Sequence, residues 1–258
     1  MAIVFLGAGG KLGRLLRPIF PECAEWLTRG DVDIFDVTAL RAALTGAGAV
    51  VCLAGVTHGL PALLNGNVDL ALRTLDAAKQ VGAGPVFLLS SAAVYGCQHG
   101  LLSEHGPTRP VSDYGRAKCA MERAAACHAH PNTVLRVGNV AGADAILGGW
   151  MPGFQLDQFA DLTTPKRSYI GPHMLARVLF DLVRAPNLPP ILNVAAPGCL
   201  QTGALLDAAG LGWTPRPASP LAIPIVNLDT SLLGRFILRK PSTSTADSIV
   251  SDWKNGLN

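Results

Sequence analysis

Aromatic and charged residues are scarce in this sequence. Of its 258 residues, 6% are aromatic and 15% are charged, and 21 Lys and Arg against 18 Asp and Glu leave a formal net charge of +3. Proteins that bind nucleic acid through their charge carry a clear excess of basic residues, so we expect no nucleic-acid partner. The six cysteines include no CxxC spacing, which gives no signal for a zinc site or a redox dithiol. We therefore expect reduced thiols and no bound metal.

Long hydrophobic runs are also lacking. Residues 42–68 and 186–206 contain no Asp, Glu, Lys or Arg, but prolines and asparagines interrupt both stretches. Neither forms the continuous apolar segment of about 20 residues that a membrane-spanning helix requires. The apolar start Met1–Leu6 has no basic leader and no cleavage-like region after it, so we expect a cytoplasmic protein without a membrane partner.

Apolar residues (49%) and 28 glycines dominate instead, and short apolar runs alternate with helical patterns through residue 140. Strands separated by helices pair in parallel through right-handed crossovers, which predicts an α/β fold with a doubly wound (Rossmann) parallel sheet. We expect a dinucleotide-binding domain over residues 1–140. Residues 141–258 would form a small substrate lobe interleaved with it, so that the whole chain is one compact unit. The expected strands are 2–6, 25–28, 32–35, 49–53, 85–90, 133–137 and 191–194, and the expected helices are 11–20, 38–44, 67–80, 114–128, 174–184 and 202–209.

The run Gly7-Ala8-Gly9-Gly10-Lys11-Leu12-Gly13 joins the first expected strand to the first helix. In such a loop Gly7 allows a tight turn, Gly10 lets the backbone approach a pyrophosphate, and Gly13 lets helix and strand pack closely. The helix N-terminus then favours the negative charge of the phosphates. An ordinary glycine-rich turn has a similar composition, but the strand–loop–helix context favours dinucleotide binding.

Tyr114 and Lys118 are four residues apart in an expected helix and therefore lie on one face of it. A nearby ammonium lowers the pKa of a phenol, which lets the phenol exchange a proton during hydride transfer. Ser91, at the end of an expected strand, is the candidate for the hydroxyl that donates to the substrate oxygen. An isolated YxxxK on a solvated helix face is common. Its occurrence after the glycine run and Ser91, in this order, makes chance an unconvincing explanation.

On these motifs the chain resembles the extended short-chain dehydrogenases/reductases, the NAD-dependent epimerase/dehydratase group. Residues 7–13 resemble GxxGxxG, residues 90–96 resemble SSxxVYG, residues 114–118 resemble YGxSK with Ala117 in place of the serine, and residues 135–142 resemble LRxxNVYG. Residues 28–40 are similar to a stretch of dTDP-4-dehydrorhamnose reductases, and residues 211–216 to small sugar-acid dehydrogenases such as uronate dehydrogenase. The resemblance extends over nearly the whole chain.

The resemblance implies roles for individual residues. Tyr114 would be the acid/base, Lys118 would hold the nicotinamide ribose, and Ser91 would orient the substrate carbonyl. Tyr95 could instead be an ordinary buried aromatic residue, and Asn139 could instead be a structural amide of a loop. The cofactor-binding residues would be Gly7, Gly9, Gly10, Lys11, Leu12, Gly13, Arg29, Asp33, Leu53, Ala54, Gly55, Tyr114, Lys118 and Val137, and the substrate-binding residues Thr57, Ser91, Tyr95, Asn139 and Arg167.

The end of the second expected strand bears on the cofactor. An NAD site uses an acidic residue about 20 residues beyond the glycines to accept from the ribose 2′-hydroxyl. Here Thr28 and Arg29 occupy that place, which favours the 2′-phosphate of NADP over NAD. Asp31 is the alternative and would restore NAD if the strand ran two residues longer.

Three functions remain in view. The first is an NAD(P)-dependent reductase or dehydrogenase that transfers a hydride between nicotinamide and a carbonyl or carbinol carbon of a sugar-like or sugar-nucleotide substrate. The second is an epimerase or dehydratase with tightly held NAD. The third is a non-catalytic dinucleotide-binding sensor, against which the Ser91, Tyr114 and Lys118 set argues. The exposed faces of the helices at 67–80 and 114–128 could pair two subunits into a homodimer.

Overall fold

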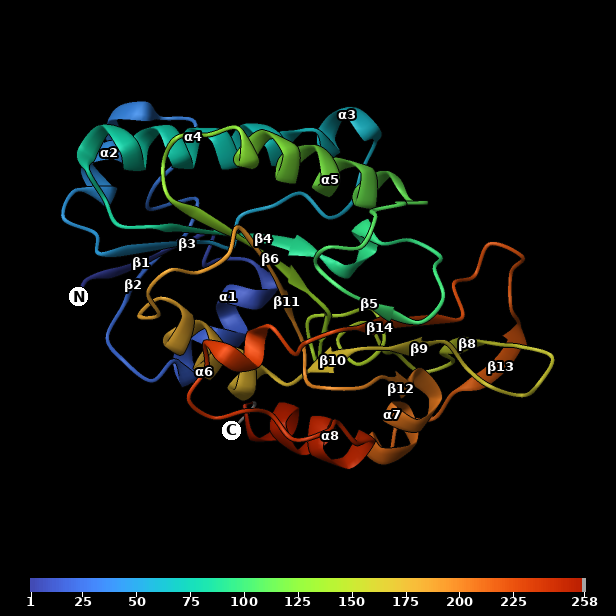
Figure 1. Cartoon of the computed structure of the whole chain (residues 1–258). Coiled ribbons are helices and arrows are strands. Elements are labelled where there is room, and N and C mark those ends of the chain that lie inside the picture. Colours follow the sequence, from blue (N-terminus) through green and yellow to red (C-terminus); the bar gives the residue numbers. More distant parts are fainter. Residues whose placement is uncertain (257–258) are drawn as a thin grey trace.

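A six-stranded parallel sheet forms the centre of the computed structural model, which describes residues 1–256 (Figure 1). The strand order is β11-β6-β4-β3-β1-β2, and every neighbouring pair is parallel. The chain begins in the interior at β1, adds β2 on one side and continues with β3 on the other. The strands are β1 (Ile3–Leu6), β2 (Glu25–Leu27), β3 (Ala49–Cys52), β4 (Val86–Ser91), β6 (Asn132–Val137) and β11 (Ile191–Val194).

Helices cover both faces of this sheet, as the alternating pattern predicts. One hydrophobic core joins the inner strands to α1 (Lys11–Leu16) and α6 (Pro172–Leu182), and a second joins them to α2 (Val37–Leu44), α4 (Gly66–Val81) and α5 (Asp113–Ala126). Figure 1 shows α2, α4 and α5 along one side of the sheet and α1 and α6 on the other. Because both faces are covered, β1 and β3 are buried along their whole length.

The second half of the chain adds a smaller lobe and also returns to the main sheet. Helix α6 and strand β11 belong to the doubly wound layers, since β11 pairs with β6. The lobe itself consists of short strands and two helices packed on a third core. Its elements from the second half are β7 (Asn139–Val140), β8 (Gln155–Gln158), β9 (Lys166–Arg167), β10 (Tyr169–Ile170), β12 (Leu200–Gln201), α7 (Thr202–Ala209), β13 (Thr214–Pro217), β14 (Ile225–Leu228) and α8 (Ala246–Asn255), and β5 (Leu101–Leu102) joins them from the first half.

Four short helical segments complete the chain, and three of them are 3₁₀ turns. They are η1 (Arg17–Ile19), α3 (Pro61–Leu64), η2 (Ala92–Val94) and η3 (Leu233–Arg235). The helix expected at 11–20 is therefore split into α1 and η1. Within residues 1–256, no helix is long and apolar enough to cross a membrane.

The strand expected at residues 32–35 does not form. The Asp33 carboxylate accepts from the Phe35 amide, and the Asp36 carboxylate accepts from the amides of Thr38 and Ala39, capping α2. These side-chain bonds hold the segment in turns, an alternative to strand pairing that Asp offers the backbone. The sheet therefore passes directly from β2 through a turn to α2, and its order of strands changes direction between β1 and β3.

Candidate active site

A cleft of about 540 Å³ opens at the carboxyl edge of β1, β3, β4 and β6. This edge, beside the point where the strand order changes direction, is where doubly wound sheets bind their ligands. Most of the predicted site residues meet here. Its walls include the predicted residues Gly7, Gly10, Lys11, Leu12, Gly13, Leu53, Gly55, Thr57, Ser91, Tyr114, Lys118, Val137 and Asn139.

The glycine loop forms one end of the cleft. Gly7 has a φ of 79°, and a Cβ there would lie 2.5 Å from the Ala54 amide nitrogen, so only glycine fits. Gly10 is the N-cap of α1, and among residues 1–256 no side chain caps that helix end. At Gly7 and Gly10 the backbone of the loop therefore faces the cleft with no side chain in front of it. This arrangement fits the pyrophosphate of a dinucleotide.

Ser91 and Tyr114 are brought together by close contact between a strand end and a helix start. Ser91 ends β4, while the Ser112 hydroxyl accepts from the Gly115 amide (3.1 Å) and caps α5. A Cβ on Gly115 would lie 2.5 Å from the Ala93 carbonyl oxygen, so glycine permits the helix to approach. Burial raises the pKa of the Tyr114 phenol, and the nearby Ser91 hydroxyl lowers that pKa in part.

Lys118 lies one turn along α5 and is 4% exposed. Its Nζ donates to the Leu89 carbonyl oxygen at 2.8 Å and lies 5.8 Å from the centre of the Tyr114 ring. A Cβ on Gly55 would lie 3.2 Å from Nζ, so glycine keeps the space around the ammonium open on the cleft side. Burial lowers the pKa of Lys118 to about 8, against an opposing effect of Cys52 and Glu122.

The loop after β7 contributes an acidic residue that the sequence analysis missed. Asp144 lines the cleft near Asn139, and its carboxylate accepts from the Tyr169 hydroxyl at 2.7 Å and from the Leu147 amide at 3.1 Å. Burial raises the pKa of this carboxyl. An acidic residue in the loop after a strand, at the ligand-binding edge, is the signal that could have identified it. His58 also lines the cleft, with Nδ1 2.8 Å from the Thr57 hydroxyl.

Two predicted substrate residues do not reach the cleft. Tyr95 is 1% exposed, and its hydroxyl donates to the Asn193 side chain at 2.7 Å inside the protein. The structure therefore corrects the pocket-wall prediction in favour of the buried aromatic. Arg167 donates from Nη1 to the carbonyl oxygens of Lys166 and Pro224, which turns its guanidinium into the small lobe.

The remaining predicted cofactor residues do not line the cleft. Gly9 approaches Thr28, and Arg29 is exposed in the turn after β2. Ala54 is the contact that Gly7 leaves room for, and the Asp33 carboxylate is occupied by the Phe35 amide. These four residues are outside the walls of the cleft itself.

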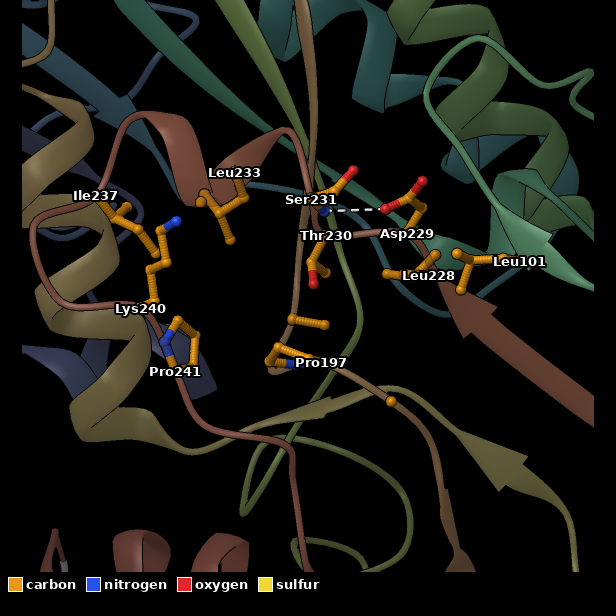
Figure 2. A pocket seen from close by; sticks show the side chains of 13 residues that line it. Leu101, Pro197, Leu228, Asp229, Thr230, Ser231, Leu233, Ile237, Lys240 and Pro241 are labelled. Atoms are coloured by element: carbon orange, nitrogen blue, oxygen red, sulfur yellow. Dashed lines mark hydrogen bonds between the residues drawn. The ribbon is translucent and has the colours of Figure 1, made fainter.

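A second cavity, of about 500 Å³, lies beneath η3 and β14 (Figure 2). Figure 2 shows Leu228, Leu233 and Ile237 around it, with Lys240 along one side. Its walls share no described residue with the cleft and include none of the predicted site residues. Size alone does not separate the two cavities, and the chemistry assigns the site to the cleft.

Comparison with known proteins identifies the class. The NAD dependent epimerase/dehydratase family matches residues 14–152, which is more than half of the chain. The chain belongs to this family of Rossmann-fold proteins, as the motif resemblance predicts.

The curated relatives include three proteins of different activity. They are a UDP-glucose 4-epimerase of Azospirillum brasilense (36% identical over 103 residues, 38% of this chain), a uronate dehydrogenase of Pseudomonas putida (27% over 137 residues, 45%), and a dTDP-glucose 4,6-dehydratase of Streptomyces antibioticus (28% over 206 residues, 70%). The chain spans 29%, 51% and 61% of the lengths of these relatives. The likeness to dTDP-4-dehydrorhamnose reductases remains a prediction.

Solved structures share the fold over nearly the whole chain. An NAD-dependent NDP-hexosamine 5,6-dehydratase superposes with a TM-score of 0.81 at 18% identity, covering 99% of this chain and 97% of that one. A UDP-glucose-4-epimerase from Stenotrophomonas maltophila with bound NAD gives 0.80 at 19% identity, covering 100% and 98%. At this identity the likeness establishes the Rossmann fold alone.

Proposed function

We propose that the protein is an NAD(P)-dependent oxidoreductase that transfers a hydride between nicotinamide and a carbonyl or carbinol carbon of a sugar-like substrate. The observation that carries the proposal is that Ser91, Tyr114 and Lys118 face the same cleft as the glycine loop. A dinucleotide bound along the loop would supply the hydride. The protein would supply a proton and hold the reacting oxygen in place.

The proton would come from the Tyr114 hydroxyl. Burial raises the pKa of this phenol, so the group is protonated at neutral pH and suited to donate to the oxygen of a carbonyl substrate. The Ser91 hydroxyl, which lines the same cleft as Tyr114, would orient the same oxygen. The Lys118 ammonium, buried beside Gly55, would bind the hydroxyls of the ribose.

The cofactor preference we propose is NADP. The exposed Arg29 guanidinium offers a cation at the end of β2, where the adenosine ribose would lie. The Asp31 carboxylate accepts from the amide and the hydroxyl of Thr28, at 2.9 and 2.7 Å, which directs it onto its own turn. The solved relatives named above bind or depend on NAD, and NAD remains the alternative.

An epimerase or dehydratase with retained NAD is the second candidate, because two of the curated relatives carry those names. Both would use the same three side chains for the oxidation; an epimerase would return the hydride to the same carbon, whereas a dehydratase would also eliminate water before the hydride returns to the sugar. The substrate would be a sugar or sugar nucleotide in either case. A homodimer formed through the exposed faces of α4 and α5 is compatible with both.

The test is a hydride-transfer assay on protein dialysed free of loosely held ligand. NADPH or NADH is offered with aldoses, ketoses, sugar acids and sugar nucleotides, and products are followed by mass spectrometry. We expect reduced nicotinamide to disappear in equal amount with the carbonyl. Conversion of a sugar to its isomer or dehydrated product, with no net loss of cofactor and with NAD retained through dialysis, would assign the second candidate. Cofactor binding without any conversion would indicate a sensor.

A further inference from the structure

A buried ion pair lies directly behind the cleft, between α5 and the main sheet. Glu122 and Arg136 are 6% and 4% exposed, and Arg136 Nη2 donates to Glu122 Oε2 at 2.7 Å. The Ser90 hydroxyl donates to Glu122 Oε1 at 2.5 Å. One carboxylate thus binds a side chain from β4 and a side chain from β6 at the same time.

Glu122 and its hydrogen-bond partner Ser90 each lie close in the sequence to a predicted site residue. Glu122 follows Lys118 by four residues on α5, which places both on the same face of the helix. Ser90 immediately precedes Ser91 on β4. The Ser90–Glu122 hydrogen bond therefore joins the strand that carries the substrate-orienting hydroxyl to the helix that carries Tyr114 and Lys118.

Arg136 is held from its other side as well. It pairs with Ser90 in the parallel register of β4 and β6, and its Nη1 donates to the Tyr95 hydroxyl at 3.0 Å. Tyr95 donates in turn to the Asn193 side chain on β11, at 2.7 Å. Burial opposes the charge of Arg136, but the hydrogen bonds and charge of Glu122 outweigh that effect and raise its pKa. The guanidinium is therefore a charged, immobile support for Glu122.

Such a pair is not explained by stability. An apolar pair of similar size usually stabilises a protein as well as a buried ion pair does, because both charges lose their hydration. A charged network adds directional bonds, which apolar packing lacks. Placed beside a reactive site, those bonds fix the relative positions of the elements that they connect.

We propose that Glu122 is a positioning residue for the hydride-transfer site: by holding Ser90 and Arg136 together it sets the distance between Ser91 on β4 and Tyr114 and Lys118 on α5. The inference rests on the proposed oxidoreductase function. It extends that function to a residue that does not line the cleft. Glu122 also opposes, together with Cys52, the effect of burial on Lys118, and so helps keep the ammonium charged.

The first variant that tests the proposal is Ser90→Ala, which removes the link to β4 and leaves the ion pair intact. Displacement of a reacting group by about 1 Å lowers rates by up to about 10²-fold, so we expect kcat to fall about tenfold or more. The dissociation constant of the cofactor, followed by nicotinamide fluorescence, should stay within about twofold, because Ser90, although it borders the cleft, is 4% exposed and directs its hydroxyl to Glu122. In the oxidative direction the pH midpoint of the rate should move upward, because Ser91 would no longer lower the pKa of Tyr114.

A second variant, Glu122→Gln, keeps an acceptor for Ser90 and removes the charge. We expect a loss of kcat at least as large as that of Ser90→Ala. This change can unfold the protein by leaving Arg136 unpaired, so the proposal is judged on the result for Ser90→Ala. The matched control is Arg123→Gln, which removes one charge from the adjacent, exposed position on α5 and should leave kcat and the pH midpoint unchanged.

Wild-type kcat and pH midpoint in Ser90→Ala would overturn the positioning role while leaving the proposed function standing. A loss of kcat matched by an equal loss of cofactor affinity would also overturn it, since general disorder would explain both. Failure of the wild-type protein to transfer any hydride would instead refute the proposed function, and the positioning role with it.

Discussion

Lys118 shows, at the scale of one residue, the conflict between stability and reactivity in this site. A 4% exposed ammonium with one carbonyl partner loses most of its hydration. Burial lowers the pKa of Lys118 from 10.5 to about 8, so the folded protein binds this proton less tightly than the unfolded chain does. The shift corresponds to a cost of about 3 kcal/mol in the free energy of unfolding below pH 8. Between pH 8 and 10.5 the cost disappears as the folded lysine releases its proton.

Lys118→Met should therefore make the protein more stable at neutral pH. Removing the charge gains about 3 kcal/mol, and leaving the Leu89 carbonyl oxygen without its donor costs about 1–2 kcal/mol, for a net gain of about 1–2 kcal/mol at pH 7. The gain should vanish between about pH 9 and 10, where the cost of the buried charge has fallen to that of the lost hydrogen bond, and turn into a small loss near pH 10.5; cofactor binding should be lost. Denaturant unfolding at the two pH values measures it. The control is Lys79→Met on the exposed side of α4, which should change stability by less than about 0.5 kcal/mol. A Lys118→Met protein less stable than wild type at pH 7 would show that the buried charge is not a burden.

At the scale of elements, the turn after β2 carries the residues on which the proposed cofactor preference depends. The sequence analysis places a strand at 32–35, where the structure has turns held by Asp33 and Asp36. Apolar residues at 32, 34 and 35 made the pattern strand-like, whereas the side-chain bonds of the neighbouring aspartates decide the backbone. The consequence for the site is that Arg29 and Asp31 lie in one short exposed turn, so that both remain close to the place expected for the ribose.

The substitution Arg29→Ala distinguishes an NADP-specific site from an NAD-specific one. If Arg29 binds a 2′-phosphate, loss of a charge-assisted hydrogen bond of about 1.5–3 kcal/mol should raise the KM for NADP by about 10- to 100-fold. The KM for NAD should stay within about twofold. Steady-state kinetics with both cofactors measure the ratio, and Arg123→Ala on α5 serves as the exposed-arginine control. Equal changes for NADP and NAD, or a larger effect of Asp31→Ala on NAD binding, would reverse the assigned preference.

At the scale of the whole molecule, periodicity and motifs predicted the Rossmann sheet and the grouping of the glycine loop with Ser91, Tyr114 and Lys118. The reason is that the carboxyl ends of parallel strands meet at one edge, so that residues placed after strands converge. Hydrogen bonds between residues far apart in the chain could not be predicted from the sequence. Tyr95 matched a family motif, yet Arg136 and Asn193, far along the chain, draw its hydroxyl inward. Asp144 was missed although it follows a strand at the ligand-binding edge, and the hydrogen bond from Tyr169 that holds its carboxylate there could not be predicted.

The same dependence limits what the sequence says of the small lobe. Its strands are two to four residues long and pair across large separations, β14 with β5 and β13 with β8. Segments so short carry little periodicity, and their register follows from tertiary packing. Residues 172–194, which the sequence analysis assigned to the small lobe, belong to the central layers, and the division of the chain at residue 140 stays a prediction.

The central claim is that Tyr114 exchanges the proton during hydride transfer, and Tyr114→Phe tests it most directly. The variant keeps the ring and removes one hydroxyl. On a carbonyl substrate that the wild type reduces, we predict a fall in kcat of about 10²- to 10⁴-fold, the usual contribution of a general acid. The dissociation constant of the cofactor should stay within about twofold. A Tyr114→Phe protein that retains more than about a tenth of wild-type turnover would contradict the account.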